Sequence, residues 1–577
     1  RYWLWRFNGT GQNGHIYDNA PVRDSAQYNN DNAVRFFNHH NVLVQSNFSV
    51  MYNRSFGEHE ISAYFGVERS ETHSSQEDQT KENPSAFTNG QFNTAFGAID
   101  ARTFAYEAGS LGYVGRLNYN YAGKYLAEFL FRSDASTKFA PENYWGKFYS
   151  LSAGWVMSDE NFFDVKWIDF LKLRYSVGLL GKDDMGAWMW RQRFTFQNGK
   201  GAVFGGDNTN AGIGMKMEAS PNPDATWSDD FKQNLGIDAR FLNNRLSATI
   251  ELFYNKATGM LLERTAIVPV TVGGTIASQN YGAADFFGYE LGLGWRGKVG
   301  RDFTYGIDGR FSWYDNKVRK GNFNEFDMLK PWNKRPGESD DNGVWGYDVM
   351  GMFTSQEQIN EYVSKYGITS VFGQPVANLR PGMLYYRDVR GQLQPDGTFA
   401  GPDGIIDEND QVQLSKKKNN HYSFGFTLKA SYKGFAFDAV IGGSFGGWSE
   451  LDARDATLER NISNLYLNGP AYWADIYDPV LNPTGKYPNP FHRAISLQPT
   501  SNFWKVSSFR MRLINVNLSY AVPKKVTEFL RISNARVVVT MLNPLNLYNP
   551  FGYKDPYNSW ENYPVLRTIS TGLNITF

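Results

Sequence analysis

The chain has 577 residues, 16% of them aromatic, with 58 basic and 58 acidic side chains and no cysteine. The zero net charge gives no support for nucleic acid as a partner, and the lack of cysteine excludes disulfides, thiolate nucleophiles and cysteine metal sites. Charges or clusters of Gly, Asn and Asp interrupt every apolar run before it reaches the roughly 20 residues that a membrane-spanning helix needs.

Alternating segments dominate the chain from about Asn41 onward. In one of them Glu128 and Arg132 share one face, while Phe129 and Phe131 share the other. This period of two is typical of a sheet whose faces meet different solvents, and each segment has about ten residues. The predicted strands cover residues 111–121, 125–134, 147–157, 171–179, 231–241, 245–256, 286–298, 303–314, 422–432, 435–445, 509–520, 535–542 and 568–577.

The connections between these segments are of two kinds. Short turns are predicted at 122–124, 242–244, 300–302 and 433–434, whereas long polar loops cover 181–230, 316–420 and 446–505. This asymmetry favours an all-β fold, a large antiparallel transmembrane β-barrel with short periplasmic turns and long extracellular loops, of which the chain supplies roughly 15 to 18 strands. The alternative is a soluble β-sandwich or propeller in which the aromatic residues form the core.

The last ten residues form the clearest single strand. Ile569, Leu573, Ile575 and Phe577 fall on one face, and small polar residues fall on the other. An alternating strand that closes on an aromatic residue is the end that outer-membrane assembly machinery recognises in barrels. We therefore predict that Phe577, Ile575 and Leu573 form the assembly signal.

Several phrases resemble the SusC/RagA-type TonB-dependent transporters of Bacteroidota. They are Leu111-Gly112-Tyr113-Val114-Gly115-Arg116-Leu117-Asn118-Tyr119, Phe131-Arg132-Ser133-Asp134, Trp145-Gly146-Lys147-Phe148, Asn222-Pro223-Asp224, Phe241-Leu242-Asn243-Asn244-Arg245-Leu246 and Phe287-Gly288-Tyr289-Glu290-Leu291. The resemblance implies a bacterial outer-membrane barrel of about 22 strands that encloses an N-terminal plug. It also implies coupling to TonB and a SusD-like lipoprotein as an outer lid.

The resemblance sets our expectation for domains and function. The chain opens on Arg1 without a signal peptide, so we expect 1–577 to be the C-terminal portion of one barrel domain. The signal peptide, TonB box and plug are expected to precede residue 1. The implied function is TonB-dependent import of a glycan or peptide, with outer-membrane lipids as surroundings and a dimer of transporter-lipoprotein pairs as a possible assembly. The alternatives are a structural or secretion-associated barrel subunit and a soluble glycan-binding β-protein.

One acidic cluster has the spacing of a split calcium loop. Asp388, Asp403, Asp407 and Asp410 would supply carboxylates, and Ile405 would supply a backbone carbonyl. The alternative is a solvated acidic loop. We expect no cofactor that the protein requires, and calcium is the one candidate ion.

Aromatic residues in the long loops are suited to stacking on sugar rings or gripping peptides. Their alternatives are local loop packing and contact with the lipoprotein lid. No histidine pair with metal-ligand spacing, serine nucleophile elbow or phosphate loop occurs, so we expect no catalytic residues and no enzyme. The candidate contact residues are Trp188, Trp190, Trp332, Trp345, Tyr385, Tyr386 and Trp448.

Overall fold

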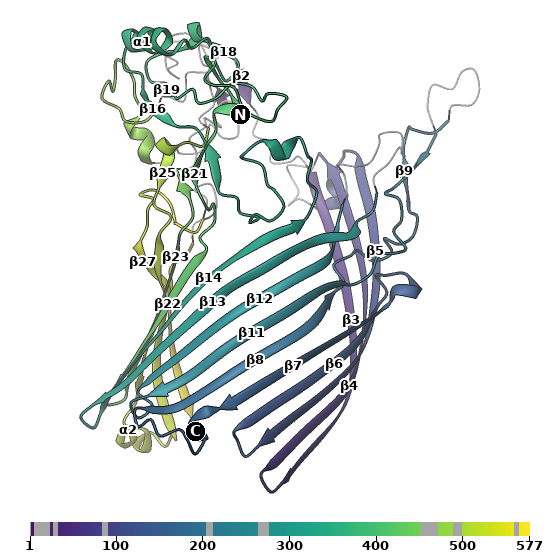
Figure 1. Ribbon diagram of the computed structural model, residues 1–577, viewed down its shortest axis with the longest axis vertical. Helices are drawn as coiled ribbons and strands as arrows, with labels where there is room; N and C mark the ends of the chain where they lie inside the picture. Colours follow the sequence, from purple (N-terminus) through teal and green to yellow (C-terminus); the bar gives the residue numbers. More distant parts are fainter. Residues whose placement is uncertain are drawn as a thin grey trace.

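A large sheet forms the wall of the molecule in the computed structural model, which describes residues 2–4, 24–26, 33–83, 91–202, 212–263, 276–451, 471–488, 499–558, 563 and 565–577. Its 15 strands are paired antiparallel and curve into a barrel wall (Figure 1). Neighbours in the sheet follow chain order from β3 at one end to β28 at the other. The strands are β3 (Ala33–Phe56), β4 (His59–Glu82), β5 (Ile99–Tyr121), β6 (Tyr125–Ser136), β7 (Trp145–Val156), β8 (Ile168–Lys182), β11 (Ser228–Phe241), β12 (Leu246–Leu262), β13 (Gln279–Val299), β14 (Phe303–Lys320), β22 (Tyr422–Tyr432), β23 (Phe435–Phe445), β26 (Arg510–Ala521), β27 (Asn534–Tyr548) and β28 (Thr568–Thr576).

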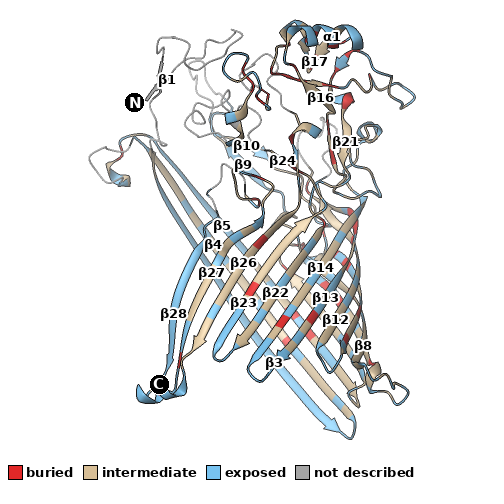
Figure 2. Ribbon diagram, turned by 90° about the vertical axis from the view of Figure 1, so that its left-hand side faces the viewer, coloured by how far each residue is buried: buried red, intermediate tan, exposed pale blue. Residues whose placement is uncertain are grey.

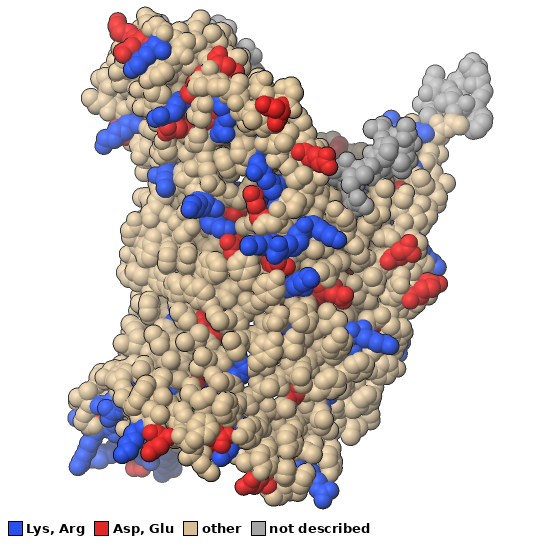
Figure 3. Space-filling view, in the orientation of Figure 1, with Lys and Arg blue, Asp and Glu red and all other residues tan. Residues whose placement is uncertain are grey.

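The two faces of the wall differ as the alternation predicts. Phe129, Leu151, Leu252 and Leu293 are exposed on the outer face, where they are available to lipid. On the face seen in Figure 3, charged side chains gather above and below a band that carries few of them. An apolar band between charged rims is the outer surface of a transmembrane barrel. The predicted fold class is therefore confirmed.

The predicted short turns close hairpins at one rim. Lys433 and Gly434 connect β22 to β23 with φ of 44° and 89°, the left-handed pair that matches the twist of a two-residue hairpin. Leu242, Asn243 and Asn244 lie between β11 and β12 with φ of 58°, 60° and 59°. Asparagine tolerates this region better than most residues. These turns lie at the lower edge in Figure 1, and the long loops lie at the other.

The wall is taller on one side than the sequence predicts. β3 and β4 each have 24 residues and β5 has 23, while the predicted segments include neither β3 nor β4. The outer part of β4 is polar on both faces, because both faces of the ribbon meet water there. Without an apolar face the period of two disappears.

The long loops build a compact unit above the wall (Figure 1). Its core contains Phe353 and Ile406, both 0% exposed, and Trp504, 2% exposed. No helix in the described part of the chain is long and apolar enough to cross a membrane. The unit contains β15 (Val344–Gly346), β16 (Val349–Met352), α1 (Gln356–Tyr366), β17 (Ser370–Val371), β18 (Gln374–Pro375), β19 (Leu384–Tyr386), β20 (Ile405–Ile406), β21 (Val412–Ser415), β24 (Ser449–Glu450) and β25 (Lys505–Val506); elsewhere lie β1 (Tyr2–Leu4), β2 (Asp24–Ala26), β9 (Phe194–Gln197), β10 (Gly214–Met217) and α2 (Lys524–Phe529).

Helix α1 is fixed by its ends and by one face. Ser355 caps its first turn by accepting a hydrogen bond from the N–H of Gln358, and Gly367 ends it in the left-handed region. Ile359 and Tyr362 are buried, and the hydroxyl of Tyr362 donates to the carbonyl of Tyr386 at 2.6 Å. The helix is therefore a structural part of the outer unit.

Replacement of Phe353 by alanine tests whether the outer unit has a core of its own. We expect Phe353→Ala to destabilise the unit by about 3 to 5 kcal/mol, because the cavity replaces a fully buried ring. Hydrogen exchange should quicken at α1 and leave the barrel strands unchanged. Phe326→Ala is the control, since Phe326 is 61% exposed. Unchanged exchange at α1 in the Phe353 variant would contradict this interpretation.

Candidate functional site

The inner face of the wall is lined by paired charges that reach across strands. Arg174 on β8 donates to Asp238 at 3.1 Å and to Glu251 on β12 at 2.7 Å. Its guanidinium passes over Gly236 of the intervening β11, where a Cβ would lie 2.5 Å from Cζ. Glycine therefore permits this close approach, since a side chain here would force Arg174 to shift.

A second arginine repeats the arrangement in the next part of the wall. Arg132 on β6 donates to Asp134 at 3.1 Å and to Glu68 on β4 at 2.9 Å. It crosses β5 at Gly112, where a Cβ would lie 3.3 Å from Nη2 and 2.4 Å from an Asp134 oxygen. On the inner face the first network links three neighbouring strands through side chains, and the second links β6 to β4 across β5.

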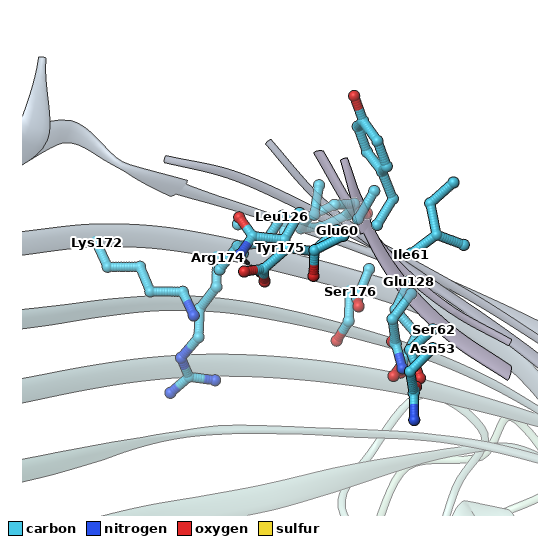
Figure 4. Close-up of a pocket in the computed structure, with 18 of the residues that line it drawn as sticks. Asn53, Glu60, Ile61, Ser62, Leu126, Glu128, Lys172, Arg174, Tyr175 and Ser176 are labelled. Atoms are coloured by element: carbon cyan, nitrogen blue, oxygen red, sulfur yellow. Dashed lines mark hydrogen bonds between the residues drawn. The ribbon is translucent and has the colours of Figure 1, made fainter. Parts of the chain in front are cut away.

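A hollow of about 730 Å³ lies between these networks and the short turns. Glu60, Glu128, Lys172 and Arg174 are among its lining residues (Figure 4). Glu60 accepts a hydrogen bond from Asn120 at 2.9 Å. The inner surface thus offers charges of both signs and amide groups to whatever fills the lumen, and it is suited to a polar occupant rather than an apolar one.

A second hollow, of about 400 Å³, lies where the long loops meet the outer ends of β22, β23 and β26. Cationic and aromatic side chains line it together. Trp448 is among the predicted contact residues. The lining residues are Lys418, Asn419, Asn420, Ser444, Trp448, Ser449, Glu450, Arg510, Phe551, Lys554 and Tyr557.

Asp341 fixes the segment that carries two of these residues. Its carboxylate accepts from the N–H groups of Lys418 and Asn419, both at 2.8 Å, and lies 3.0 Å from Nε2 of His421. Nδ1 of His421 lies 2.6 Å from the carbonyl of Tyr314 in β14. Burial alone would raise the pKa of Asp341, but these hydrogen bonds outweigh it and lower the pKa to about 2.

The predicted calcium loop is folded on its own hydrogen bonds. Asp388 accepts from the N–H of Gly404 at 2.6 Å and Asp403 from that of Ile405 at 3.0 Å. Asp410, 0% exposed, accepts from the N–H groups of Val389, Arg390 and Asp407, and burial raises its pKa to about 6.

The arrangement of these acids does not form a ready ion cage. Within the described residues no group of three or more His, Cys, Asp or Glu side chains could hold a metal ion. One buried oxygen, Oδ1 of Asp388, has no hydrogen-bond partner among them. Asp407 caps the short 3-10 helix at Glu408–Asp410. Calcium binding by Asp388, Asp403, Ile405, Asp407 and Asp410 stays a prediction.

The predicted aromatic contact residues are spread over several places. Tyr386 is 2% exposed in the core of the outer unit, and Tyr385 stacks on Phe353 with 4.6 Å between ring centroids. Trp332 lies beside Phe399, and the Nε1 atom of Trp345 is buried. Trp188 and Trp190 lie together in another loop, each near Arg191. Of the seven, Trp448 is the one that lines a described hollow.

The predicted assembly signal lies on β28 at the end of the sheet. Leu573 and Phe577 are 61% and 90% exposed, and Leu573 shares the outer face with Val537 of β27. Ile575 lies between them and is 42% exposed. The three side chains are thus accessible on one face of an edge strand, and their role as a signal stays a prediction.

Sequence reasoning did not single out the cations of the outer hollow. Arg510 is the first residue of β26, and Lys418 lies in a run of three lysines before β22. Neither position stands out in a chain of balanced charge. The one sequence feature that bears on Arg510 is Asp555, an acidic residue that follows β27. In the structure Asp555 pairs with Arg512 rather than with Arg510.

The chain is similar in sequence to outer-membrane transporters. TonB-dependent receptor SusC of Bacteroides thetaiotaomicron is 25% identical over 484 residues, which are 81% of this chain and 44% of that protein. TonB-dependent receptor P26 of Formosa agariphila is 26% identical over 497 residues, 81% of this chain and 46% of that protein. No family model matches the chain.

A solved structure shows the same fold. The RagAB peptide importer in its closed-closed state superposes with a TM-score of 0.72 at 19% identity, over 94% of this chain and 56% of that one. The chain spans about half the length of the curated relatives it matches. The chain is SusC/RagA-like, and its sheet has the fold of the wall of an outer-membrane transporter barrel.

Asp341→Asn tests the anchor beneath the outer hollow. A carboxyl whose pKa is lowered by folding stabilises the fold above its ordinary pKa near 4, and this stabilisation is lost as the pH falls toward 2. At pH 7 we expect the Lys418 and Asn419 amides to exchange about fivefold faster in the variant, which corresponds to about 1 kcal/mol after solvent screening. The difference should vanish near pH 2. Asp340→Asn is the control, and equal exchange in all three proteins would refute the anchor.

Calcium binding can be measured directly on protein stripped with a chelator. Titration calorimetry should show one site if the acidic loop rearranges around the ion, and Asp403→Asn should abolish it because a carboxylate is lost. Asp396→Asn is a matched control, since Asp396 lies in the same loop and bonds Thr398 instead. No heat in the wild-type protein at millimolar calcium would contradict the predicted site.

Proposed function

We propose that this chain forms the barrel wall and outer loops of a TonB-dependent importer that takes up a nutrient with a SusD-like lipoprotein. The observation that carries the proposal is the charged inner face of a 15-stranded wall that opens beneath a folded outer unit. The match to TonB-dependent receptors over 81% of the chain supports it.

The inner wall is suited to hold a polar plug. Arg174 and Arg132 are each neutralised by two carboxylates, so the wall stays rigid while Glu128 and Lys172 face the hollow near the short turns. A plug supplied by another part of the protein would meet these groups. Movement of the plug, powered through TonB, would then open the path.

The outer unit is suited to meet a lid and the substrate. It stands above the opening of the wall (Figure 2), and its core keeps it folded as one body. A lipoprotein that closes over it would enclose the outer hollow. RagAB is named as a peptide importer, whereas a glycan remains the other substrate class that we expected from the sequence.

A structural or secretion-associated barrel is the second candidate, and uptake separates it from an importer. We expect cells that carry the complete protein to accumulate its nutrient, and uptake to fall to background when TonB or the neighbouring lipoprotein is deleted. The reason is that a plugged barrel does not conduct without energy. Growth and uptake assays on a panel of glycans and peptides measure this.

The control is re-expression of the deleted gene, which should restore uptake. A complete protein whose loss alters no uptake, but disrupts a larger outer-membrane assembly, would favour the structural role and refute import.

A further inference from the structure

The outer hollow contains a guanidinium that no carboxylate of the described residues neutralises. Arg510 donates from Nη2 to the hydroxyl of Ser449 at 3.1 Å. Its Nε is buried and has no acceptor among the described residues. Arg512, two residues along β26, is paired with Asp555 and donates to Asn546 at 2.8 Å. The neighbouring acid thus serves Arg512, and Arg510 is left to face the hollow.

The hollow has an excess of positive charge. Lys418 and Lys554 line it together with Arg510, and Glu450 is the one carboxylate among the lining residues. Glu450 is already engaged, because it accepts from Nε1 of Trp448 at 3.2 Å and from the hydroxyl of Thr500 at 3.3 Å. An anion that enters would meet Arg510 and Lys418, neither of which forms an ion pair with another described residue.

The backbone of Lys418 and the guanidinium of Arg510 have fixed neighbours before a ligand arrives. Asp341 fixes the backbone of Lys418 through two hydrogen bonds. The Arg510 guanidinium lies 5.8 Å from the ring centroid of Tyr557, and that of Arg512 lies 4.5 Å from it. Rings and guanidinium groups at such distances attract one another. A preformed site loses less entropy on binding.

The walls offer side chains rather than backbone to a ligand. β22, β23 and β26 are each paired on both sides, so none of them presents a free edge to an extended peptide. Tyr557 is 43% exposed at the hollow and Trp448 adds a second ring. Aromatic surface beside cations matches a sugar ring that carries an acidic group.

We propose that this hollow binds an acidic oligosaccharide, with a carboxylate or sulfate group on Arg510 and Lys418 and a sugar ring against Tyr557. The inference rests on the proposed import function and names its substrate class. The bidentate geometry of a guanidinium fits planar carboxylates and sulfates alike. Binding should therefore weaken with added salt.

Binding to the complete detergent-solubilised protein tests the proposal. The probes are oligogalacturonate for carboxylate, chondroitin sulfate oligosaccharide for sulfate, maltooligosaccharide of equal length as the neutral sugar, and oligoglutamate as the acidic peptide. We expect at least one acidic sugar to bind ~10- to 100-fold more tightly than the neutral one, the range of one or two charge-assisted hydrogen bonds.

Variants assign the binding to the hollow. Arg510→Gln and Lys418→Gln should each weaken acidic-sugar binding about tenfold, and Arg510→Lys should recover part of the loss because charge returns without the planar fork. Lys416→Gln is the matched control, since Lys416 is exposed two residues away and does not line the hollow. Equal hydrogen exchange in the barrel strands shows that each variant is folded.

Three results would overturn the proposal: equal binding of neutral and acidic sugars, preference for oligoglutamate, or acidic-sugar binding that Arg510→Gln leaves unchanged. Each of them leaves import itself intact if uptake of some nutrient still requires TonB. Loss of TonB dependence with acidic-sugar binding retained would instead remove the transport function and keep the site.

Discussion

Backbone hydrogen bonding in a medium without water is the constraint from which this structure follows. Each N–H and C=O group inside a bilayer needs a protein partner, and a curved antiparallel sheet supplies one on both sides of every interior strand. The sheet then has one face toward lipid and one toward the lumen, so side chains alternate between Leu293 on the first and Glu290 on the second. Neighbouring antiparallel strands end side by side at one rim, so tight turns of two or three residues are enough to join them there.

The inner face shows how a membrane protein carries charge without exposing it to lipid. Arg174 and Arg132 each reach across a glycine to a glutamate two strands away. In both places the inner face is polar, and each arginine is paired with two carboxylates. At the outer hollow, by contrast, Arg510 has no carboxylate partner among the described residues. The contrast separates residues that hold the wall together from residues that can meet a ligand.

The sequence predicts those parts of the molecule in which one face of a strand meets lipid and the other meets the lumen. The strands from Leu246 to Phe445 were found because lipid-facing residues recur at every second position. The outer half of β4 was not predicted as a strand, because polar residues such as Glu71 and Gln76 occupy both of its faces. The core of the outer unit joins Phe353 to Trp504, which are far apart in sequence and share no local pattern. Trp448 was expected at a binding surface. Arg510 was not, because its lack of a partner depends on the pairing of Asp555 with Arg512, which only the structure shows.

The length of β3, β4 and β5 has a consequence for where the protein meets its surroundings. A strand of 24 residues at about 3.3 Å per residue is about 80 Å long, and a tilt near 45° leaves roughly 55 Å along the membrane normal. The apolar band of such a barrel is only about 25 Å tall. Since the turns at the other rim are short, most of the strand length beyond the apolar band projects outward from the membrane as paired strands. On that side the opening is sheltered from the sugar layer of neighbouring lipids, and a long substrate reaches it from above.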